Sequence, residues 1–410
     1  MKQRSALLPI FLIVLVDVLG FTIVIPLLGL YAERFGATPL VATTLVSVYA
    51  VCSLISTPII GRLSDQHGRK PLLMISQAGT CAGFLILGSS NALWMVFVGR
   101  ILDGLTAGNL SIAQAYISDH TAPENRAKAF GLIGIAFGFG FMFGPALGGW
   151  LGKSYGMHVP FVVAACLSLV SIVCTYTLLP AETPKLAGAP AGDIGPGGRR
   201  PSAFDWQTYA TYFRRPGLLA LYTQFFLFSF AFSCFTSGFA LYAERKFTTS
   251  GGQAWGSAEV GYLFMYTGLL GIILQGGILG RLVKKYGELR LTTAGFVSAA
   301  IAYALIGLAH GLVLLIAGAT ISAFGNGVLR PVITSRLTQA VGRHEQGVAL
   351  GISGSLSSVA MALAPPVGGT MIDQHWLLAW ALVPASTVTL GLIATLAWSA
   401  RLAAGAPPPR

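Results

Sequence analysis

Three ionisable residues, Asp17, Arg100 and Asp103, lie deep within long apolar stretches of this sequence. Ionisable residues in such stretches are rare and usually functional. The three-residue spacing places Arg100 and Asp103 on one face of a helix. Burial disfavours a charged carboxylate and a neighbouring arginine favours it, so two acids that share one arginine are suited to bind and release a proton. We interpret Asp17 as the main proton carrier, tuned by Arg100 and Asp103; the alternative is that the arginine merely neutralises the acids.

The composition indicates that these residues lie in a membrane. Of the 410 residues, 54% are hydrophobic and only 10% are charged, and the mean hydropathy is +0.72. A soluble domain does not combine so much apolar residue with so little charge, and a helix needs about 20 apolar residues to cross a bilayer. We therefore predict an all-α membrane protein with twelve transmembrane helices, at 7–30, 41–61, 72–91, 93–118, 128–152, 159–180, 217–242, 258–281, 291–310, 312–338, 347–370 and 377–400.

The depth of the two acids can be calculated from these spans. Asp17 and Asp103 each lie ten residues into a span, or about 15 Å at 1.5 Å per residue. Because the hydrocarbon core is about 30 Å thick, both carboxylates are expected near its midplane. The first span contains Asp17 and no small-residue cleavage site, so we expect it to be retained rather than removed as a signal peptide.

The positive charge predicts the orientation. With the N-terminus in the cytosol, only Arg34, Lys153, Arg245 and Lys246 of the 26 Lys and Arg residues fall on the opposite side, and Arg100 and Arg330 fall within spans. Cytosolic loops of membrane proteins carry an excess of Lys and Arg. We therefore predict an inner-membrane protein with both termini cytosolic, and we attribute the net charge of +12 to topology rather than to nucleic-acid binding.

The sequence predicts no enzyme, cofactor or metal site. Its five cysteines lie in apolar spans without metal-ligand spacing, and its six histidines lie in or near loops or span ends. It contains no phosphate-binding glycine loop, zinc signature or nucleophile elbow.

A Gly/Pro-rich linker at 181–216 divides the chain into halves at 1–180 and 217–400, and we expect residues 401–410 to form a disordered tail. A short helix around 204–213 is expected to lie on the membrane surface. The halves share three landmarks in the same order. Residues 30–34 match 241–245, residues 61–63 match 280–282, and residues 144–149 resemble 364–369. Six spans in each half give both copies one orientation, which predicts a pseudo-two-fold axis along the membrane normal.

Four motifs identify the kind of protein that this sequence resembles. They are the basic turn at 61–71, the Gly-Arg-Ile-Leu-Asp-Gly segment at 99–104, the glycine-rich run at 134–149, and Leu-Val-Asp-Val-Leu-Gly at 15–20 followed by Pro26. Together with the 6+6 repeat, they resemble the major facilitator superfamily, and in particular its drug:proton antiporters such as bacterial tetracycline and multidrug exporters. The resemblance implies two six-helix bundles related by a pseudo-two-fold axis.

The resemblance also implies roles for the loops. The basic turn resembles a cytosolic gate that packs against neighbouring helix ends, formed by Gly61, Asp65, Gly68 and Arg69 with Asp119 as a candidate partner. The alternative for these charges is a positive-inside anchor. The run ending in Gly144, Pro145, Gly148 and Gly149 resembles the antiporter motif of the fifth span, which should pack closely and limit leakage.

Candidate substrate contacts lie in both halves. Arg330 is about eight residues from the cytosolic end of its span, or roughly 12 Å deep; it either extends to that interface or forms a cation in the cavity. Neutral polar groups in the spans are Asn109, Gln114, Gln224 and Asn326, for which interhelical bonding is the alternative. The many aromatic residues of the seventh span suit a bulky apolar or aromatic substrate.

The sequence thus predicts a secondary active transporter that exports an amphipathic small molecule or drug in exchange for protons, by alternating access. Its expected partners are the small-molecule substrate, protons and membrane lipid, and we expect a monomer that needs no cofactor. A proton symporter or facilitative uniporter is one alternative. A non-transporting receptor or scaffold is another, because spans 7–12 contain no Asp or Glu well inside the membrane.

Overall fold

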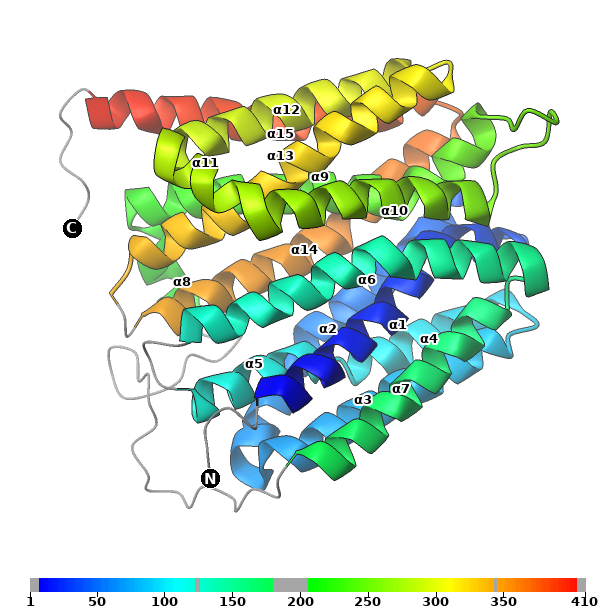
Figure 1. Ribbon diagram of the computed structural model, residues 1–410, viewed down its shortest axis with the longest axis horizontal. Coiled ribbons are helices and arrows are strands. Elements are labelled where there is room, and N and C mark those ends of the chain that lie inside the picture. The colour runs from blue at the N-terminus through cyan, green and yellow to red at the C-terminus, as the bar shows by residue number, and fades with distance from the viewer. Residues whose placement is uncertain (1–6, 122–125, 180–205, 343–344, 404–410) are drawn as a thin grey trace. The chain divides into compact units, whose positions relative to one another are not determined.

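The computed structural model describes residues 7–121, 126–179, 206–342 and 345–403. In these residues the chain is helical, apart from turns and one isolated bridge between Thr248 and Ala254. The helices of the first half are α1 (Leu7–Glu33), α2 (Pro39–His67), α3 (Arg69–Gly88), α4 (Leu93–Leu105), α5 (Asn109–His120), α6 (Arg126–Tyr155) and α7 (Val159–Leu178) (Figure 1).

The second half begins with the short helix α8 (Trp206–Phe213), which confirms the helix expected around 204–213. Most of the predicted linker, and the tail from residue 404 onwards, lie outside the described residues. The remaining helices are α9 (Pro216–Lys246), α10 (Ser257–Ile273), a π-helical turn (Leu274–Ile278), α11 (Leu279–Tyr286), α12 (Glu288–Leu308), α13 (Leu312–Gln339), α14 (Gln346–Asp373) and α15 (Leu377–Ala403).

Eleven helices in the described ranges are long and apolar enough to cross a membrane. The fourth predicted span is the exception, and the prediction of one continuous helix over 93–118 is wrong. This stretch is divided into α4 and α5 by an irregular turn at 106–108. The break leaves backbone polar groups without helical partners, which is tolerated in a membrane only where other protein groups satisfy them.

Hydroxyl groups from two neighbouring helices satisfy the break. Ser76 on α3 donates to the carbonyl of Thr106 and accepts from the amide of Gly108 at 2.8 Å. On α2, Thr57 donates to the carbonyl of Ala107 at 2.9 Å, and Ser56 donates to that of Gly104 at 2.7 Å. The break is therefore built by residues outside the fourth span.

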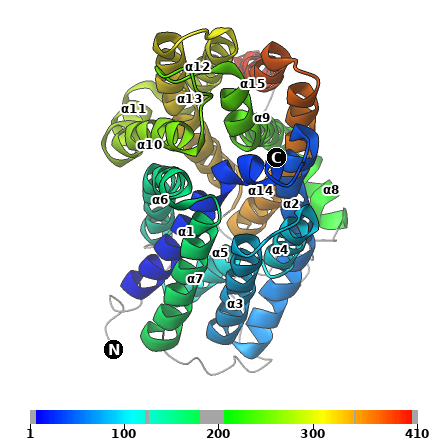
Figure 2. The same ribbon diagram turned by 90° about the vertical axis from the view of Figure 1, so that its right-hand side faces the viewer.

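By packing, the described chain forms two compact units. One contains the residues up to 179 together with Ser237–Ile272, and the other contains the residues from 206 to Thr236 together with those from Ile273 onwards. In the first unit, α1 packs against α6 and α7, and α3 packs against α4 and α7 (Figure 2). In the second, α12 packs against α13 and α15. The predicted domain boundary at the linker follows the sequence repeat. Packing instead assigns the end of α9 and α10 up to Ile272 to the first unit.

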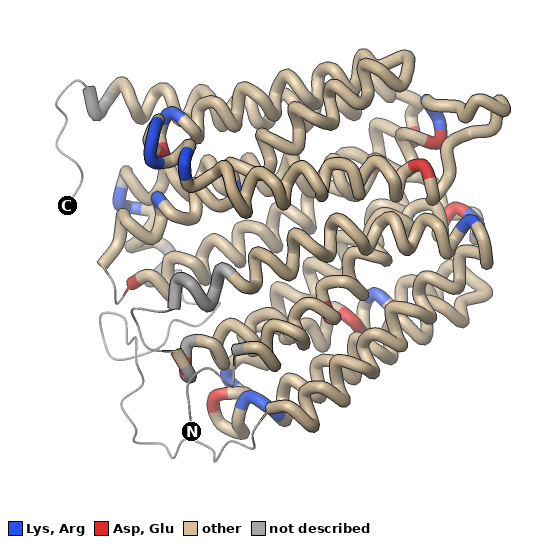
Figure 3. Tube along the Cα trace, viewed as in Figure 1, with Lys and Arg blue, Asp and Glu red and all other residues tan. Residues whose placement is uncertain are grey.

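Charged residues of the described chain gather near the ends of the helices, and few lie along their middles (Figure 3). Asp17 on α1 and the residues Arg100 and Asp103 on α4, all inside predicted spans, are considered next.

Candidate functional site

Asp17 lies on α1 in a network of neutral side chains. The Gln77 amide on α3 donates to Asp17 Oδ2 at 3.3 Å and to Ser171 Oγ on α7 at 2.7 Å. Thr175 on α7 donates to Gln77 Oε1 at 3.0 Å. Asp17 Oδ1 is also buried and has no hydrogen-bond partner among the described residues. Asp17 is thus partly buried, and its hydrogen-bond partners among the described residues carry no charge.

Arg100 and Asp103 form the ion pair that their spacing predicts. Arg100 Nη1 lies 2.8 Å from Asp103 Oδ2, and the two residues are only 1% and 3% exposed. The guanidinium also lies over the ring of Tyr49, 4.3 Å from its centroid. Its Nε and Nη2 are buried without a hydrogen-bond partner in the described chain. Arg100 and Asp103 thus neutralise each other's charge, while two N–H groups of the guanidinium make no hydrogen bond in the described chain.

The structure therefore divides the three predicted coupling residues into two sets. Asp17 bonds to Gln77 and Arg100 bonds to Asp103, and within the described ranges no ion pair or hydrogen bond joins Asp17 to Arg100. Helix α3 lies beside both sets, because Thr80, three residues after Gln77, is hydrogen-bonded to Asp103. Gln77 is the residue that sequence reasoning missed, although a glutamine inside an apolar span was a visible signal.

The predicted gate residues meet at the start of α3. Arg69 is 6% exposed; its Nη1 lies 2.5 Å from Asp65 Oδ1, and its Nε lies 3.1 Å from Asp119 Oδ2 at the end of α5. Gly68 precedes it with φ of 93°, a conformation that favours glycine, whereas Gly61 has open space around its α-carbon. The turn thus buries one arginine between two acids.

The second half contains this turn with its charges exchanged. The 219-residue offset that aligns Gly61 with Gly280 also aligns Gly68 with Gly287, whose φ is 79°. The same offset replaces Asp65 by Lys284 and Arg69 by Glu288. Glu288 Oε1 accepts from Ser335 Oγ at 2.6 Å and from Gln339 Nε2 at 3.0 Å.

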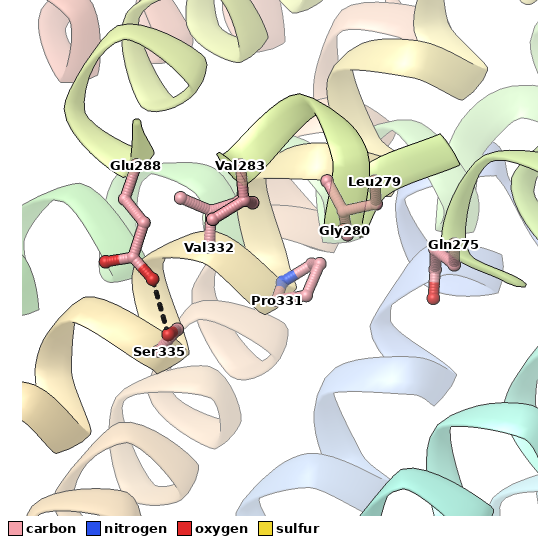
Figure 4. Close-up of a pocket in the computed structure, with 8 residues that line it drawn as sticks. All are labelled: Gln275, Leu279, Gly280, Val283, Glu288, Pro331, Val332 and Ser335. Carbon is pink, nitrogen blue, oxygen red and sulfur yellow. Dashed lines mark hydrogen bonds between the residues drawn. The ribbon is translucent and has the colours of Figure 1, made fainter. Parts of the chain in front are cut away.

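A pocket of about 290 Å³ lies beside this second turn (Figure 4). Its lining combines the carboxylate and hydroxyl of Glu288 and Ser335 with mainly apolar residues, which are Gln275, Leu279, Gly280, Val283, Pro331 and Val332. In the first half, the larger side chain of Arg69 is buried in the corresponding position.

Two predicted cavity residues make contacts between helices. Asn326 on α13 accepts from the Tyr303 hydroxyl on α12 at 3.2 Å and donates to Ser322 at 2.9 Å. Gln224 on α9 accepts from Arg336 Nη1 at 3.3 Å. Both contacts agree with the alternative of interhelical bonding. Gln224 is fully buried, whereas Asn326 is partly exposed.

The remaining predicted cavity residues lie on α5 and α13. Asn109 begins α5 and is partly buried, while Gln114 and Arg330 are exposed on α5 and α13. Near Asn326, however, the Phe235 ring lies 5.1 Å from that of Tyr303 and 5.7 Å from that of Trp380, measured between centroids. An aromatic cluster thus borders the neutral polar group of the second half.

The glycine motif on α6 permits close approach on two sides. A methyl group at Gly144 would overlap Thr22 on α1, and one at Gly148 would lie 2.8 Å from the carbonyl of Ile23. At Gly149 it would overlap the backbone of Ser257 on α10, and a methyl group at Gly261 on α10 would overlap the carbonyl of Pro145. These residues therefore allow α6 to pack tightly against both α1 and the start of α10.

An ion pair between Arg215 and Glu345 lies outside the spans, directly before the start of α14. Arg215 binds Glu345 through two hydrogen bonds of 2.9 and 3.1 Å. These bonds hold the pKa of the Glu345 carboxyl below its usual value. The pair connects the turn between α8 and α9 with the residue that precedes α14.

Comparison with known proteins identifies the family. Residues 10–312 and 276–410 match the model of the Major Facilitator Superfamily. The chain belongs to this superfamily.

Among relatives of this superfamily member, tetracycline resistance protein class B of Escherichia coli is 29% identical over 90% of this chain and 88% of its own. Multidrug resistance protein 1 of Bacillus subtilis (strain 168) is 26% identical over 98% of both chains. Solute carrier family 67 member A1 of Homo sapiens is 30% identical over 83% of this chain and 80% of its own.

Solved structures agree on the fold. The human organic anion transporter MFSD10 gives a TM-score of 0.69 at 21% identity, covering 96% of this chain and all of that one. The nucleoside transporter NupG (D323A mutant) gives 0.77 at 12% identity, covering 96% of this chain and 99% of that one. This chain is accordingly a multi-pass membrane transporter with the major facilitator fold, and not an enzyme.

Proposed function

We propose that this major facilitator transporter exports amphipathic small molecules from the cytosol in exchange for protons. The observation that carries the proposal is the Asp17 carboxylate on α1, whose Oδ1 is buried and whose hydrogen-bond partners in the described chain are neutral. The similarity to proteins named for tetracycline and multidrug resistance supports the same direction of transport.

The Asp17 environment favours a change of protonation during the cycle. A carboxylate in a low-dielectric site is stabilised by hydrogen-bond donors and destabilised by lost hydration. Gln77 donates one bond to Asp17, while Oδ1 receives none from the described residues. A proton on Oδ1 removes the uncompensated charge, so we assign Asp17 the role of binding a proton from outside and releasing it to the cytosol.

Helix α3 provides a route from this acid to the gate. It carries Gln77 beside Asp17, Thr80 beside Asp103 and, at its first residue, Arg69 bound to Asp119. A shift of α3 on protonation of Asp17 would therefore reach both the buried ion pair and the turn. We assign Asp65, Arg69 and Asp119 to the cytosolic gate.

The break in the fourth span allows its two parts to respond separately. Helix α4 carries Arg100 and Asp103, whereas α5 carries Asn109, Gln114 and Asp119. Because side-chain hydroxyls replace some of the helical backbone bonds at 106–108, we propose that α5 tilts while α4 keeps its buried pair. This arrangement suits alternating access around a midplane site.

The second half contains a neutral cluster that we assign to recognition. Tyr303, Phe235 and Trp380 are buried, and they pack and hydrogen-bond around Asn326, which is partly exposed. We propose that Asn326 contacts the substrate and that the buried aromatic residues fix its position, in a site that suits a bulky, largely apolar molecule with a few polar groups. Arg330, deep in its span by sequence, is our candidate for an additional charged contact.

The distribution of Lys and Arg supports an inner-membrane location with both termini in the cytosol. We further propose that the monomer is the working unit, with the transported molecule, protons and surrounding lipid as its partners.

Everted membrane vesicles test the direction of coupling. Their lumen is acidified by respiration, and tetracycline or a cationic dye is then added outside, on the cytosolic face. We expect the lumen to become more alkaline as the substrate enters, and vesicles lacking the protein are the control. No pH change during substrate entry would indicate a uniporter, and substrate-dependent proton movement in the same direction as the substrate would indicate a symporter.

Counterflow of labelled substrate in proteoliposomes tests transport itself. Exchange is expected without a proton gradient. Purified protein that binds the substrate but shows no exchange would favour a receptor or scaffold.

A further inference from the structure

The repeated segments at 30–34 and 241–245 have no role in the scheme above, yet the structure brings them together. Both read Leu-Tyr-Ala-Glu-Arg, and they end α1 and α9. Arg245 Nη2 lies 2.5 Å from Glu33 Oε1 and its Nη1 lies 3.5 Å from Glu244 Oε2. The arginine of the second copy thus contacts the glutamate of each copy.

The backbone of α1 approaches the second segment closely at the same place. A methyl group at Gly29 would lie 3.1 Å from the Leu241 side chain, so this side chain packs directly against Gly29. The three ionic side chains keep partial access to solvent, at 24% for Arg245, 19% for Glu33 and 38% for Glu244. Arg245 is therefore held between acids at an accessible helix end.

A second ion pair joins the ends of α6 and α10. Lys153 Nζ lies 2.7 Å from Glu259 Oε1. Nearby, the Ser257 hydroxyl donates to the Gly149 carbonyl at 3.0 Å, and Ser257 is 6% exposed. Like the first pair, this contact joins a helix of the first repeat to one of the second, within a single compact unit.

The positive-inside pattern gives these pairs significance. Only Arg34, Lys153, Arg245 and Lys246 lie opposite the cytosol in the predicted topology. Two of these four cations are used in ion pairs that tie the two repeats together at that end. The positive-inside rule predicts few Lys and Arg residues on the side opposite the cytosol. The two paired cations on that side therefore indicate a role other than setting the topology.

We propose that Glu33–Arg245 and Lys153–Glu259 form an external gate, which keeps the outer ends of the repeats together while the cytosolic side is open. The proposal rests on the proposed orientation and alternating access. Partly exposed ion pairs contribute little individually, which suits contacts that must break once in every cycle. When Glu33 moves away, Arg245 still forms an ion pair with Glu244. This remaining pair lowers the free energy needed to open the gate.

Thiol labelling from outside intact cells tests the gate. Ser257 is replaced by cysteine in a chain whose five native cysteines are changed to alanine, and a membrane-impermeant maleimide is added. Since Ser257 is buried against Gly149, labelling reports opening of the outer end. Arg245→Glu removes the contacts with both Glu33 and Glu244 and places like charges together. We expect it to raise the labelling rate about fivefold or more, the scale of losing partly exposed ion pairs. The double variant Glu33→Arg/Arg245→Glu restores the pair with residue 33 and should slow the labelling again.

Two further variants sharpen the result. Glu259→Gln should also accelerate labelling, whereas Arg34→Glu, a charge reversal at the same end, should leave the rate unchanged. Unchanged labelling in both Arg245→Glu and Glu259→Gln would overturn the proposal, as would a double variant that labels as fast as Arg245→Glu. Retained counterflow shows that the variants are folded.

The labelling requires neither substrate nor a proton gradient, so it is independent of the export assay. Failure of drug export with normal labelling would leave the gate intact. Labelling of residue 257 only in everted vesicles would refute the proposed orientation.

Discussion

The polar networks of the two halves differ in charge. In the first half, the neutral groups Gln77 and Ser171 surround the acid Asp17. In the second, Tyr303, Asn326 and Ser322 form a hydrogen-bonded chain without an ionisable carboxyl group. The two halves therefore share helices and turns but differ in the ionisable groups of their polar networks. We assign proton coupling to the first half and substrate recognition to the second.

The turns that follow α2 and α11 show the same divergence. Both place a positive-φ glycine between two helices, yet Arg69 is buried between acids while Glu288 bonds to neutral groups beside a pocket. The glycine conformation is thus the same in both turns, whereas the charges that follow it differ. The first turn is thus our candidate for the gate that responds to coupling.

The largest expected effect comes from removing the one acid in the neutral network. Asp17→Asn should lower gradient-driven transport to the level of vesicles without the protein, because the amide cannot exchange a proton. Counterflow should persist, since it needs no net proton movement. Radiolabelled substrate uptake measures both, and unchanged gradient-driven uptake would disprove the assignment of Asp17.

The buried ion pair should dominate stability. Asp103→Asn leaves the Arg100 charge without its partner and should cost about 3–5 kcal/mol, as expected for a broken buried pair. Unfolding in detergent measures this loss. The double variant Arg100→Gln/Asp103→Asn removes both charges and should be more stable than the single variant; equal losses would show that the pair is not the cause.

The turns provide a matched comparison of function. Asp65→Asn removes one of the two acids at Arg69 and should slow exchange about threefold to tenfold, because a buried charge loses part of its compensation. Substrate affinity should be unchanged. Lys284→Gln, the aligned position in the second half, should alter neither quantity; loss of binding in Asp65→Asn alone would argue against a gate.

Substrate affinity should depend on the hydrogen bonds between Tyr303, Asn326 and Ser322. Tyr303→Phe removes a hydroxyl bound to Asn326, and we expect the KM for transport to change about fivefold, the effect of one hydrogen bond. The pH dependence of transport should stay that of the wild type. A shifted pH profile with unchanged KM would place coupling in the second half and break the proposed division.

The smallest effect concerns the ion pair outside the spans. Because Arg215 lowers the pKa of Glu345 below its usual 4.5, the pair stabilises the fold above that pH and loses its effect as pH falls through the lowered pKa. Glu345→Gln should therefore reduce stability by about 0.5 kcal/mol at neutral pH. Thermal unfolding at several pH values should show the two proteins converge in acid, and a constant difference would contradict this cause.

The sequence predicts most of the helices because each apolar run is long enough to cross a bilayer alone. It also predicts the contact between Arg100 and Asp103, which depends only on helical spacing. The break at 106–108 could not be found in the same way, since the hydroxyls of Thr57 and Ser76 come from other helices. The partner of Asp17 depends on how α1, α3 and α7 are rotated, which apolar spans with little periodicity do not specify.

The central claim is that Asp17 exchanges the coupled proton. Purified protein in weakly buffered detergent, mixed with substrate and a pH-sensitive dye, measures proton release on binding. We predict that substrate binding releases protons from the wild type and none from Asp17→Asn that still binds substrate. Asn326→Ser, which alters recognition but not coupling, is the control and should release protons at saturating substrate. Equal release from wild type and Asp17→Asn would contradict the account.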